Sequence, residues 1–550
     1  MAETPIRIGD LLISKGMLTK KQLEIALIQQ RVTGAILGDT LISLGFVTSR
    51  EFAETIALQS GIEYIDLRHF NISDEALRLI PKETARKCGY IPLEIRNSVL
   101  SIGVSNPSNV VAVDSVRHMT GNPPRVYLVD HDAYNEVIES AYYFTEHPVH
   151  RRLEELFSGI KSGTAVQGSI IPELADLLLM DGIRRKATDI HLTPSKEVLH
   201  VFYRIDGVLT YGHCLSHLFK SAIASRIKIL AHMDIAEQRL PQDGSYALGF
   251  LNRKYDLRIS SVPSIYGENI VIRVLSTSGQ LMSMTELGLN DGLIITMRGL
   301  FNRSHGILLI TGPTGSGKTT TLYSCLREID LLERNVITVE DPVEYRLNFV
   351  RQTEVNEKAG YTFASSARTF MRQDPDVMLL GEIRDPETAQ MAVRASITGH
   401  LVLSTLHTND AVTAIPRLLD LGMDKLLLSS SLMAVASQRL ARKICPHCRE
   451  EYRLSEPEKN IFKRAALEQE SGYRGRGCDR CDGTGYSGRT LISEVLVINP
   501  EIREMIYNGA STGTIYKAAL EGGMVPLVAD GLRKAASGLT TVSEIKRVSG

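Results

Sequence analysis

Short apolar runs alternate with helix-like segments through the second half of the chain. Four of these runs are short and rich in branched apolar residues, and they lie at 307–310, 335–339, 376–380 and 401–406. Runs of this length and composition are typical of fully buried strands. Their alternation with amphipathic segments predicts an α/β domain with a parallel sheet.

The first half of the chain also reads as α/β. Within residues 64–143, three short strands are expected at 90–95, 99–104 and 125–129. A helical period over 171–185 leads into strand-like alternation that continues to about residue 275. Both halves therefore predict mixed α/β domains.

Two stretches differ from this pattern. Residues 144–169 are polar and irregular, so we expect a linker there. Residues 485–550 are amphipathic, and the pattern predicts C-terminal helices.

The first 60 residues contain an internal repeat. A 24-residue unit at 7–30 is followed, after a five-residue spacer, by a second unit of equal length at 36–59. Glycine, aspartate, leucine, threonine and glutamine recur at a constant offset of 29. Apolar spacing inside each unit suits two short helices joined at the second glycine. From the residues alone, the favoured interpretation is a duplicated helical hairpin that mediates docking.

Composition narrows the class of protein. The chain has 550 residues and a net charge of −1, so three or four domains and no strong attraction to nucleic acid are expected. No apolar run reaches the ~18 residues that a membrane span needs. The N-terminus lacks a basic segment followed by an apolar one, so we expect no signal peptide and a cytoplasmic protein.

The strand at 307–310 leads into a glycine-rich loop. Residues 312–319 read Gly-Pro-Thr-Gly-Ser-Gly-Lys-Thr and match the P-loop pattern G-x-x-x-x-G-K-[ST]. Glycines let backbone N–H groups turn toward phosphate oxygens, and the next helix offers its positive N-terminal end. Lys318 can reach the β- and γ-phosphates, and the Thr319 hydroxyl suits Mg²⁺. The residues expected to bind ATP are Gly312, Pro313, Thr314, Gly315, Ser316, Gly317, Lys318, Thr319 and Thr320.

Acidic residues follow two of the other strands. Glu340 and Glu344 lie at the end of the second, and Glu382 follows the third after Gly381, where many P-loop proteins carry an aspartate that binds Mg²⁺. Strand ends beside a P-loop in a parallel sheet are where Mg²⁺ and the attacking water would lie. Glu382 is therefore the natural candidate for orienting or activating water.

Two histidines flank the fourth strand. His400 precedes the run at 401–406 and His407 follows it. A single histidine is most often a packing residue, whereas two beside a strand whose end faces the phosphates suit a sensor of the γ-phosphate. Spacing alone leaves both interpretations open.

Four of the seven cysteines form two Cys-x-x-Cys pairs separated by 29 residues, namely Cys445, Cys448, Cys478 and Cys481. Four protein thiolates make a closed tetrahedral site, which is typical of structural zinc. The gap exceeds the usual spacing of ~15–20 residues, but an inserted helix can fill it. A redox pair is the competing interpretation, although no thioredoxin-like context accompanies it.

The P-loop, the acidic box at 340–344 and the segments at 381–385 and 400–410 occur in this order. Together they resemble the motifs of the type II secretion and type IV pilus assembly ATPases, and the resemblance covers essentially the whole chain. It implies a RecA-like core preceded by a PAS-like sheet. In that family two arginines fifteen residues apart reach toward the nucleotide, and Arg258 and Arg273 match them. Arginine can neutralise charge on a transferred phosphoryl group, whereas surface ion pairing explains the same residues without a nucleotide.

The N-terminal repeat resembles the tandem motifs of the cyclic-di-GMP-binding domain in MSHA-pilus-type assembly ATPases. By that resemblance the ligand would be framed by Arg7, Gly9, Gln30, Leu37, Gly38 and Gln59. An arginine fork suits a guanine edge or a phosphate, and apolar residues can pack against base faces. The chain departs from the family motif at Ile8 and Ile36, and the second departure removes a possible cation.

These observations predict an α/β multidomain protein. The expected parts are an N-terminal regulatory domain of helical repeats plus an α/β part, a linker, a PAS-like domain, a RecA-like ATPase core, a tetracysteine zinc subdomain and a helical C-terminal subdomain, at 1–145, 146–169, 170–282, 283–440, 441–485 and 486–550.

The resemblance implies a homohexameric, Mg²⁺-dependent ATPase at the cytoplasmic face of the bacterial inner membrane. It would drive pilins through an inner-membrane platform protein, beside other machine components, with no nucleic acid as substrate and with membrane association through partners only. Cyclic di-GMP would regulate it.

Type II secretion, with a docking N-terminal domain, is the alternative. A retraction motor fits less well because that branch usually lacks the N-terminal domain and the four cysteines. A DNA translocase should carry a basic stripe, and a non-catalytic scaffold should lack the carboxylates of Glu340, Glu344 and Glu382.

Overall fold

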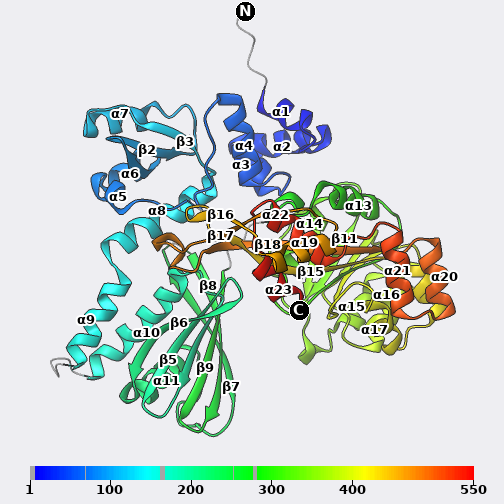
Figure 1. Cartoon of the computed structure of the whole chain (residues 1–550). Coiled ribbons are helices and arrows are strands. Elements are labelled where there is room, and N and C mark those ends of the chain that lie inside the picture. The colour runs from blue at the N-terminus through cyan, green and yellow to red at the C-terminus, as the bar shows by residue number, and fades with distance from the viewer. Residues whose placement is uncertain (1–6, 69, 162–166, 252, 277–280) are drawn as a thin grey trace, which may run out of the picture. The chain divides into compact units, whose positions relative to one another are not determined.

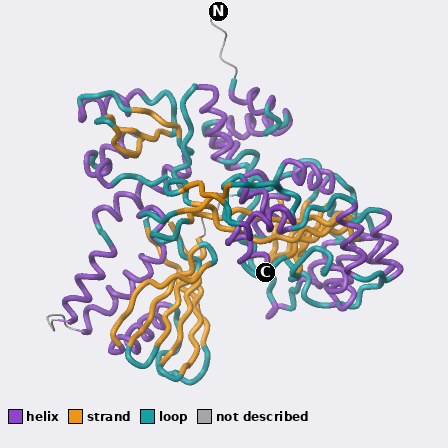
Figure 2. Tube along the Cα trace, viewed as in Figure 1, coloured by secondary structure: helices purple, strands orange, loops and turns teal. Residues whose placement is uncertain are grey.

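The structure, a computed structural model, describes residues 7–68, 70–161, 167–251, 253–276 and 281–550. The chain forms two compact units, Met1–Gly38 with Ser49–Gly279 and Asp39–Thr48 with Gln280–Gly550. Both units mix helices and strands (Figures 1 and 2). The predicted α/β multidomain class is therefore confirmed.

Short helices form both N-terminal repeat units. The first unit contains α1 (Ile8–Ser14) and α2 (Lys20–Thr33), and the second contains α3 (Leu37–Ser43) and α4 (Ser49–Ser60). Gly16 and Gly45 follow the first helix of each unit with φ angles of 68° and 76°. Glycine adopts this left-handed conformation without steric cost, which explains why it recurs at the turn.

Residues after the repeat form a small α/β module. Its sheet has the order β1-β2-β3, with β1 antiparallel and β3 parallel to β2. The elements are α5 (Asp74–Leu79), α6 (Lys82–Cys88), β1 (Tyr90–Arg96), β2 (Val99–Val104), α7 (Val110–Thr120), β3 (Arg125–Leu128) and α8 (His131–Glu146). The three strands lie where the sequence predicts them.

The segment predicted as an irregular linker contains a helix, so that prediction was wrong. In α9 (Val149–Lys161), Val149, Leu153 and Leu156 recur on one face and are buried. They share a core with residues of α10 (Gln167–Arg184). The charged residues between them hid this helical period in the sequence. Positions 162–166 of the predicted linker lie outside the described residues.

A six-stranded antiparallel sheet follows, with the order β6-β5-β4-β9-β8-β7. Its strands are β4 (Asp189–Pro194), β5 (Val198–Ile205), β6 (Val208–Ser216), β7 (Gln242–Phe250), β8 (Arg253–Ser264) and β9 (Gly267–Ser276). The apolar faces of α10 and α11 (Lys220–Leu230) are buried in one core with this sheet.

A seven-stranded sheet forms the core of the second unit, in the order β12-β11-β13-β14-β10-β15-β18. Its parallel strands are β10 (Gly306–Thr311), β11 (Val336–Glu340), β12 (Val350–Glu354), β13 (Val377–Leu380), β14 (Leu401–Leu406) and β15 (Leu432–Ile444). The four predicted apolar runs become β11, β13, β14 and β10, which lie side by side. Every residue in these four strands is buried, as expected for a parallel sheet covered on both faces.

Helices cover this sheet and form the C-terminal part of the chain (Figure 1). They are α12 (Met284–Leu287), α13 (Asp291–Phe301), α14 (Lys318–Arg327), α15 (Phe363–Phe370), α16 (Pro386–Ile397), α17 (Ala414–Asp420), α18 (Lys425–Ser431), α20 (Pro500–Asn508), α21 (Thr512–Glu521), α22 (Leu527–Ala536) and α23 (Val542–Ser549).

The C-terminal segment is only partly helical, which corrects the sequence prediction. Its first residues form β18 (Tyr486–Val497), which pairs antiparallel with β15 and completes the sheet. The run from Leu491 to Val497 has five apolar residues in seven, all of them branched, so it is suited to a buried strand.

The cysteine-containing segment is inserted between β15 and β18. It contains β16 (Arg449–Arg453), α19 (Glu456–Arg464) and β17 (Ser471–Gly475), and β16 pairs antiparallel with β17. The inserted helix that the long spacing predicts is therefore present. Among the described residues, every helix is too short or too polar to cross a bilayer.

Candidate functional site

The glycine-rich loop joins β10 to α14 at the carboxyl edge of the parallel sheet. Gly312 has a φ of 147°, and a Cβ on it would lie 2.5 Å from the Gln438 carbonyl and 2.6 Å from Ser316 Oγ. Only glycine fits there. In the described part of the chain, the buried hydroxyls of Thr311 and Ser316 have no hydrogen-bond partner. A tight loop with unused donors at a helix N-terminus fits a bound phosphate chain.

Lys318 begins α14 and folds back over the loop. Its Nζ donates to the carbonyls of Gly312 at 2.9 Å and Pro313 at 3.1 Å. Burial and the nearby Arg439 guanidinium lower the pKa of Lys318 to about 8. A phosphate chain would provide a negatively charged partner for this ammonium. Thr319 and Thr320 follow in the first turn, where the sequence places the Mg²⁺-binding hydroxyl.

Two further residues on β15 lie at the site, and sequence reasoning missed both. Gln438 Nε2 donates to the Ser316 carbonyl at 2.9 Å. Arg439 donates to the Asn409 carbonyl at 2.6 Å and lies close enough to Lys318 to affect its pKa. β15 follows the P-loop by more than a hundred residues, so only the strand order could have revealed this contact.

The side chains of Glu382 and His407, both predicted site residues, lie next to each other at the carboxyl edge of the sheet. Ser404 and Thr405 on β14 donate to the carbonyls of Leu380 at 2.6 Å and Gly381 at 2.8 Å, which ties the two strand ends together. His407 Nε2 consequently lies 3.3 Å from Glu382 Oε2.

Cations surround this pair. Burial, Lys318 and Arg384 lower the pKa of His407, in that order. Arg384 also contacts Glu382 and lies 3.9 Å from Asp341. Sequence reasoning assigned no role to Arg384 or Asp341. The carboxyl edge of the sheet thus collects a carboxylate, a histidine and two cations beside the P-loop, which suits binding and hydrolysis of a nucleoside triphosphate.

Gly381 replaces the aspartate of many P-loop proteins for a steric reason. A Cβ on Gly381 would lie 3.0 Å from the Phe363 ring and 3.2 Å from the Val339 carbonyl. A side chain at this position would require the Phe363 ring or the Val339 carbonyl to shift by a few tenths of an ångström, and Glu382 is the acidic residue at this strand end.

Glu340 is the last residue of β11, and its carboxylate is enclosed. It accepts hydrogen bonds from Tyr323 Oη, from Thr338 Oγ1 at 2.7 Å and from Gln352 Nε2 at 3.1 Å, and the residue is 4% exposed. Glu344, in the loop beyond, is exposed. The two members of the predicted acidic pair therefore have different environments.

His400 does not lie at the site, so the prediction of two phosphate sensors was wrong for this residue. It precedes β14, whereas the P-loop follows the other end of the neighbouring β10, and Leu401 pairs with Gly306 at the far edge. Six residues of strand separate the two edges by about 20 Å. His400 Nδ1 instead lies 2.9 Å from the Ala395 carbonyl at the end of α16.

Arg258 and Arg273 are cross-strand neighbours on β8 and β9. Arg273 Nε donates to Asp189 Oδ1 at 3.1 Å, and Arg258 lies 3.7 Å from Asp256. About half of each arginine side chain is exposed, at 57% and 50%. The carboxylates offset the repulsion between two opposed arginines.

The N-terminal candidates divide into packed glycines and more accessible residues. A Cβ on Gly9 would lie 3.0 Å from Leu23, and one on Gly38 would lie 2.5 Å from the Phe52 ring. Close helix packing therefore explains both glycines. Arg7 and Gln59 are exposed, whereas Gln30 and Leu37 are half-buried.

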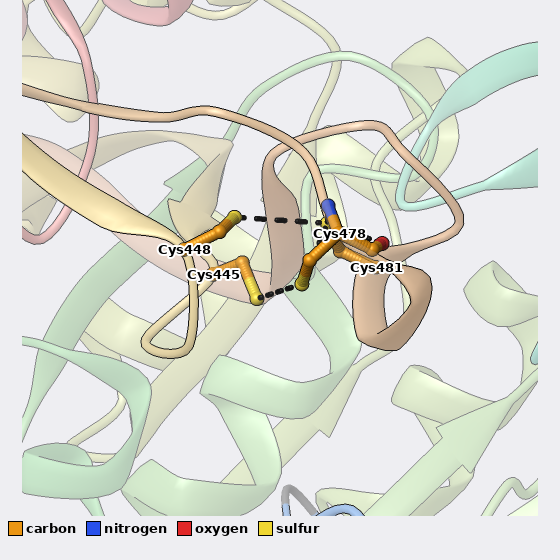
Figure 3. A group of neighbouring side chains, drawn as sticks. All are labelled: Cys445, Cys448, Cys478 and Cys481. Atoms are coloured by element: carbon orange, nitrogen blue, oxygen red, sulfur yellow. Dashed lines mark hydrogen bonds between the residues drawn. The ribbon is translucent and has the colours of Figure 1, made fainter.

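The four cysteines come together from two turns that are distant in sequence (Figure 3). Their sulfurs all lie within 4.8 Å of one another, with pairs at 3.9, 3.8 and 3.7 Å. Zn–S bonds of about 2.3 Å in a tetrahedron require S···S edges of about 3.8 Å. Burial would raise the pKa of Cys481, but the backbone N–H groups of Cys478 and Gly485 lower it to about 7. The donor set and its geometry fit a zinc ion.

Comparison with known families gives two matches. Residues 164–547 match the family described as Type II/IV secretion system protein, and residues 60–148 match the MshEN domain. The second match begins directly after the repeat units, which end at Gln59.

Similar proteins cover nearly the whole chain. The Type IV pilus assembly ATPase PilB of Myxococcus xanthus is 35% identical over 564 residues, 98% of each chain. The Type II secretion system protein E of Xanthomonas campestris pv. campestris is 36% identical over 566 residues, 100% of this chain and 99% of its own. The ATPase DotB of Legionella pneumophila, at 20% identity, covers 68% of this chain and 95% of its own with a TM-score of 0.51. The last likeness concerns the fold and agrees with a RecA-like ATPase core.

Proposed function

The chain belongs to the family of type II/IV secretion system proteins and is an ATPase, and from this premise we propose that it powers assembly of a type IV pilus. The observation that carries the proposal is the cluster of Lys318, Glu382 and His407 at one sheet edge, in a chain that matches a pilus assembly ATPase over 98% of both lengths. ATP hydrolysis would supply the mechanical work.

In the proposed site, the P-loop and Lys318 hold the phosphates and the Thr319 hydroxyl contributes to Mg²⁺ binding. Bound Mg²⁺ supplies charge neutralisation at the phosphate oxygens. Glu382 orients the attacking water, and Glu344 from the acidic box is a second candidate for this role. His407, held beside Glu382, senses the γ-phosphate.

We assign Arg258 and Arg273 to the same reaction as donors to the nucleotide phosphates. Their exposure supports this role, because about half of each arginine side chain remains open to a ligand while it pairs with Asp189 or Asp256. The six-stranded sheet that carries them corresponds to the PAS-like domain of the family.

The working assembly is a homohexamer on the cytoplasmic side of the inner membrane. It acts on an inner-membrane platform protein together with other machine components, and it reaches the membrane through these partners. The tetracysteine site holds a structural zinc ion that fixes the insert between β15 and β18.

Residues 1–60 bind cyclic di-GMP in this proposal. The match to the MshEN domain directly after the repeat supports the assignment. Exposed apolar side chains on the two units offer surfaces for flat bases, namely Ile28, Val32, Ile36 and Leu58 at 60%, 82%, 72% and 68% exposure. Arg7 at the start of the first unit supplies a charged donor for a guanine edge or a phosphate.

Type II secretion is the second candidate, because the Xanthomonas secretion protein is as similar to the chain and is matched over 99% of its length. The test replaces the chromosomal copy with Lys318→Ala or Glu382→Gln and scores surface pili and secreted enzymes, with Cys214→Ser as a matched control. Loss of pili with normal secretion supports the proposal. Loss of secretion with normal pili selects the alternative, and no effect on either process rejects both.

A further inference from the structure

A buried hydrogen-bond network connects the P-loop helix α14 to the acidic-box loop. Tyr323 lies on α14, one and a half turns after Lys318, and its hydroxyl donates to Glu340 Oε2. Thr338 Oγ1 and Gln352 Nε2 donate to the other oxygen of the same carboxylate, at 2.7 and 3.1 Å. Three donors from three elements therefore meet on one carboxylate.

The same side chains hold the loop that follows Glu340. Gln352 Nε2 donates to the Tyr345 carbonyl at 2.9 Å, and Gln352 Oε1 accepts from the Leu347 N–H at 2.7 Å. The Tyr345 N–H lies 3.4 Å from Tyr323 Oη. The loop that carries Asp341 and Glu344 is thus tied at two positions to the network around Glu340.

Ring packing adds to the connection. The rings of Tyr323 and Tyr345 meet edge to face, with centroids 5.3 Å apart and an angle of 83° between the planes. Tyr323 is 2% exposed, and burial together with Glu340 raises its pKa. The phenol therefore stays a neutral hydrogen-bond donor over the working pH range.

This environment leaves Glu340 unsuited to act as a general base. A base must reach the proton of an attacking water, but both Glu340 oxygens already accept bonds from protein donors and the residue is 4% exposed. A buried carboxylate that is fully hydrogen-bonded stabilises the groups around it.

We propose that Tyr323 and Glu340 are positioning residues that couple the P-loop helix to the loop carrying Glu344. Phosphates held at the N-terminus of α14 fix that helix, and the Tyr323–Glu340 bond then fixes the acidic-box loop at a set distance from them. Small displacements of positioned groups have large effects on rate. Turnover therefore depends on this bond, whereas nucleotide affinity does not.

The test measures kcat and KM for ATP in the full-length chain with Tyr323→Phe, Glu340→Gln and the double variant. Tyr323→Phe keeps the ring and removes only the hydroxyl. We expect each single variant to lower kcat by about tenfold with KM changed less than about twofold. The double variant should be no worse than the poorer single variant, because the bond that Tyr323→Phe removes is one of those that Glu340→Gln disturbs. Tyr361→Phe is the matched control, since it removes a tyrosine hydroxyl that donates at 3.1 Å to Thr353 on β12.

Other readouts separate positioning from acid–base chemistry and from unfolding. The acid limb of the pH–rate profile should be unchanged in Glu340→Gln; its disappearance would make Glu340 a base and overturn the proposal. Wild-type kcat in Tyr323→Phe, or additive losses in the double variant, would also overturn it. If Tyr323→Phe no longer bound a fluorescent ATP analogue, the hydroxyl would be needed to keep the ATP site folded. That result would also reject the proposal.

Discussion

His407 Nε2 lies 3.3 Å from Glu382 Oε2, and the two residues follow neighbouring parallel strands. The contact places a histidine whose pKa is lowered, by burial and then by Lys318, against an acidic residue at the carboxyl edge of the sheet. A neutral imidazole can accept or donate one hydrogen bond without adding charge to the site. This pairing suits the proposed roles of His407 as a sensor of the γ-phosphate and of Glu382 as the carboxylate that would orient water.

The first prediction separates phosphate binding from hydrolysis. Glu382→Gln should bind ATP normally but lose turnover by on the order of 10³-fold, because the carboxylate proposed to orient or activate the attacking water is replaced by an isosteric amide. Lys318→Ala should abolish hydrolysis and weaken ATP binding, because the phosphates lose their point charge. Fluorescent-nucleotide binding and phosphate release measure the two effects. Near wild-type turnover by Glu382→Gln would remove it from the role of catalytic carboxylate.

Much of this site could be predicted because parallel sheets gather strand ends on one edge. The apolar runs located β10, β11, β13 and β14, and so placed Lys318, Glu382 and Glu340 at that edge. His400 was misplaced because it precedes its strand, and in a parallel sheet the residue before a strand lies at the edge opposite the P-loop. Gln438 and Arg439 could not be found from motifs, since their strand reaches the loop only through the order of strands in the sheet.

The wrong predictions for α9 and β18 share a physical cause. Charged residues interrupt the apolar period of α9, and its burial depends on a partner helix, α10, most of which lies beyond the segment. Likewise, β18 is a strand because β15 provides a pairing edge across the cysteine insert. Both outcomes depend on tertiary contacts that local periodicity does not contain.

The second prediction concerns Arg258 and Arg273. Replacing either with alanine should lower turnover more than nucleotide affinity, since a guanidinium that neutralises developing charge acts mainly in the transition state. Arg204→Ala is the matched control, because Arg204 lies 3.6 Å from Asp189, the carboxylate that Arg273 also contacts. Steady-state ATPase assays measure the effect. Unchanged turnover in both single variants would leave only ion pairs within the sheet.

Zinc is the subject of the third prediction. Metal analysis of the purified chain should find about one Zn²⁺ per chain, bound by four thiolates. Cys445→Ser or Cys478→Ser should lose the metal and destabilise the insert, while ATP turnover changes only indirectly. Cys214→Ser, which alters an exposed cysteine outside the cluster, should retain the metal. A folded wild-type chain without metal would contradict the assignment.

The fourth prediction is a pH dependence of C-terminal stability. Glu544 is buried, and although burial raises its pKa, hydrogen bonds from Arg547 and Arg442 lower it to about 2. A carboxylate with a depressed pKa stabilises the folded state above its ordinary value of 4.5, and the contribution is lost as the pH falls from there toward about 2.

Glu544→Gln should therefore destabilise α23 at pH 7 by about 3 kcal/mol, because the two arginines lose their buried partner. The difference between variant and wild type should shrink steadily below pH 4.5. Hydrogen exchange of the α23 amides measures it, with Glu521→Gln at an exposed position as the control. A difference that is the same at pH 7 and pH 3 would show that the ion pairs are not responsible.

The fifth prediction concerns the N-terminal repeat. Two similar units suit a ligand that is itself two similar halves, so the full-length chain should bind cyclic di-GMP saturably at micromolar concentration. Arg7→Ala should weaken binding by about tenfold or more, because it removes a charge-assisted pair of hydrogen bonds. Arg31→Ala, which removes an exposed arginine near the end of α2, should not change the affinity. Calorimetric titration measures both.

Gly38 offers a second test of the same prediction. If it serves packing alone, stability and ligand affinity should change together, whereas a glycine that contacts the ligand should affect affinity separately. Gly38→Ala would place a Cβ 2.5 Å from the Phe52 ring and should push α3 and α4, the two helices of the second repeat unit, apart. Combining it with Phe52→Ala relieves this clash, so the double variant should regain both its thermal stability and its affinity if the glycine serves only packing. Regained stability without regained affinity would place the ligand against Gly38 itself. Absence of saturable binding by the wild-type chain would leave the repeat as a docking module, with the exposed Val32 and Ile36 as candidates for contact with a protein partner.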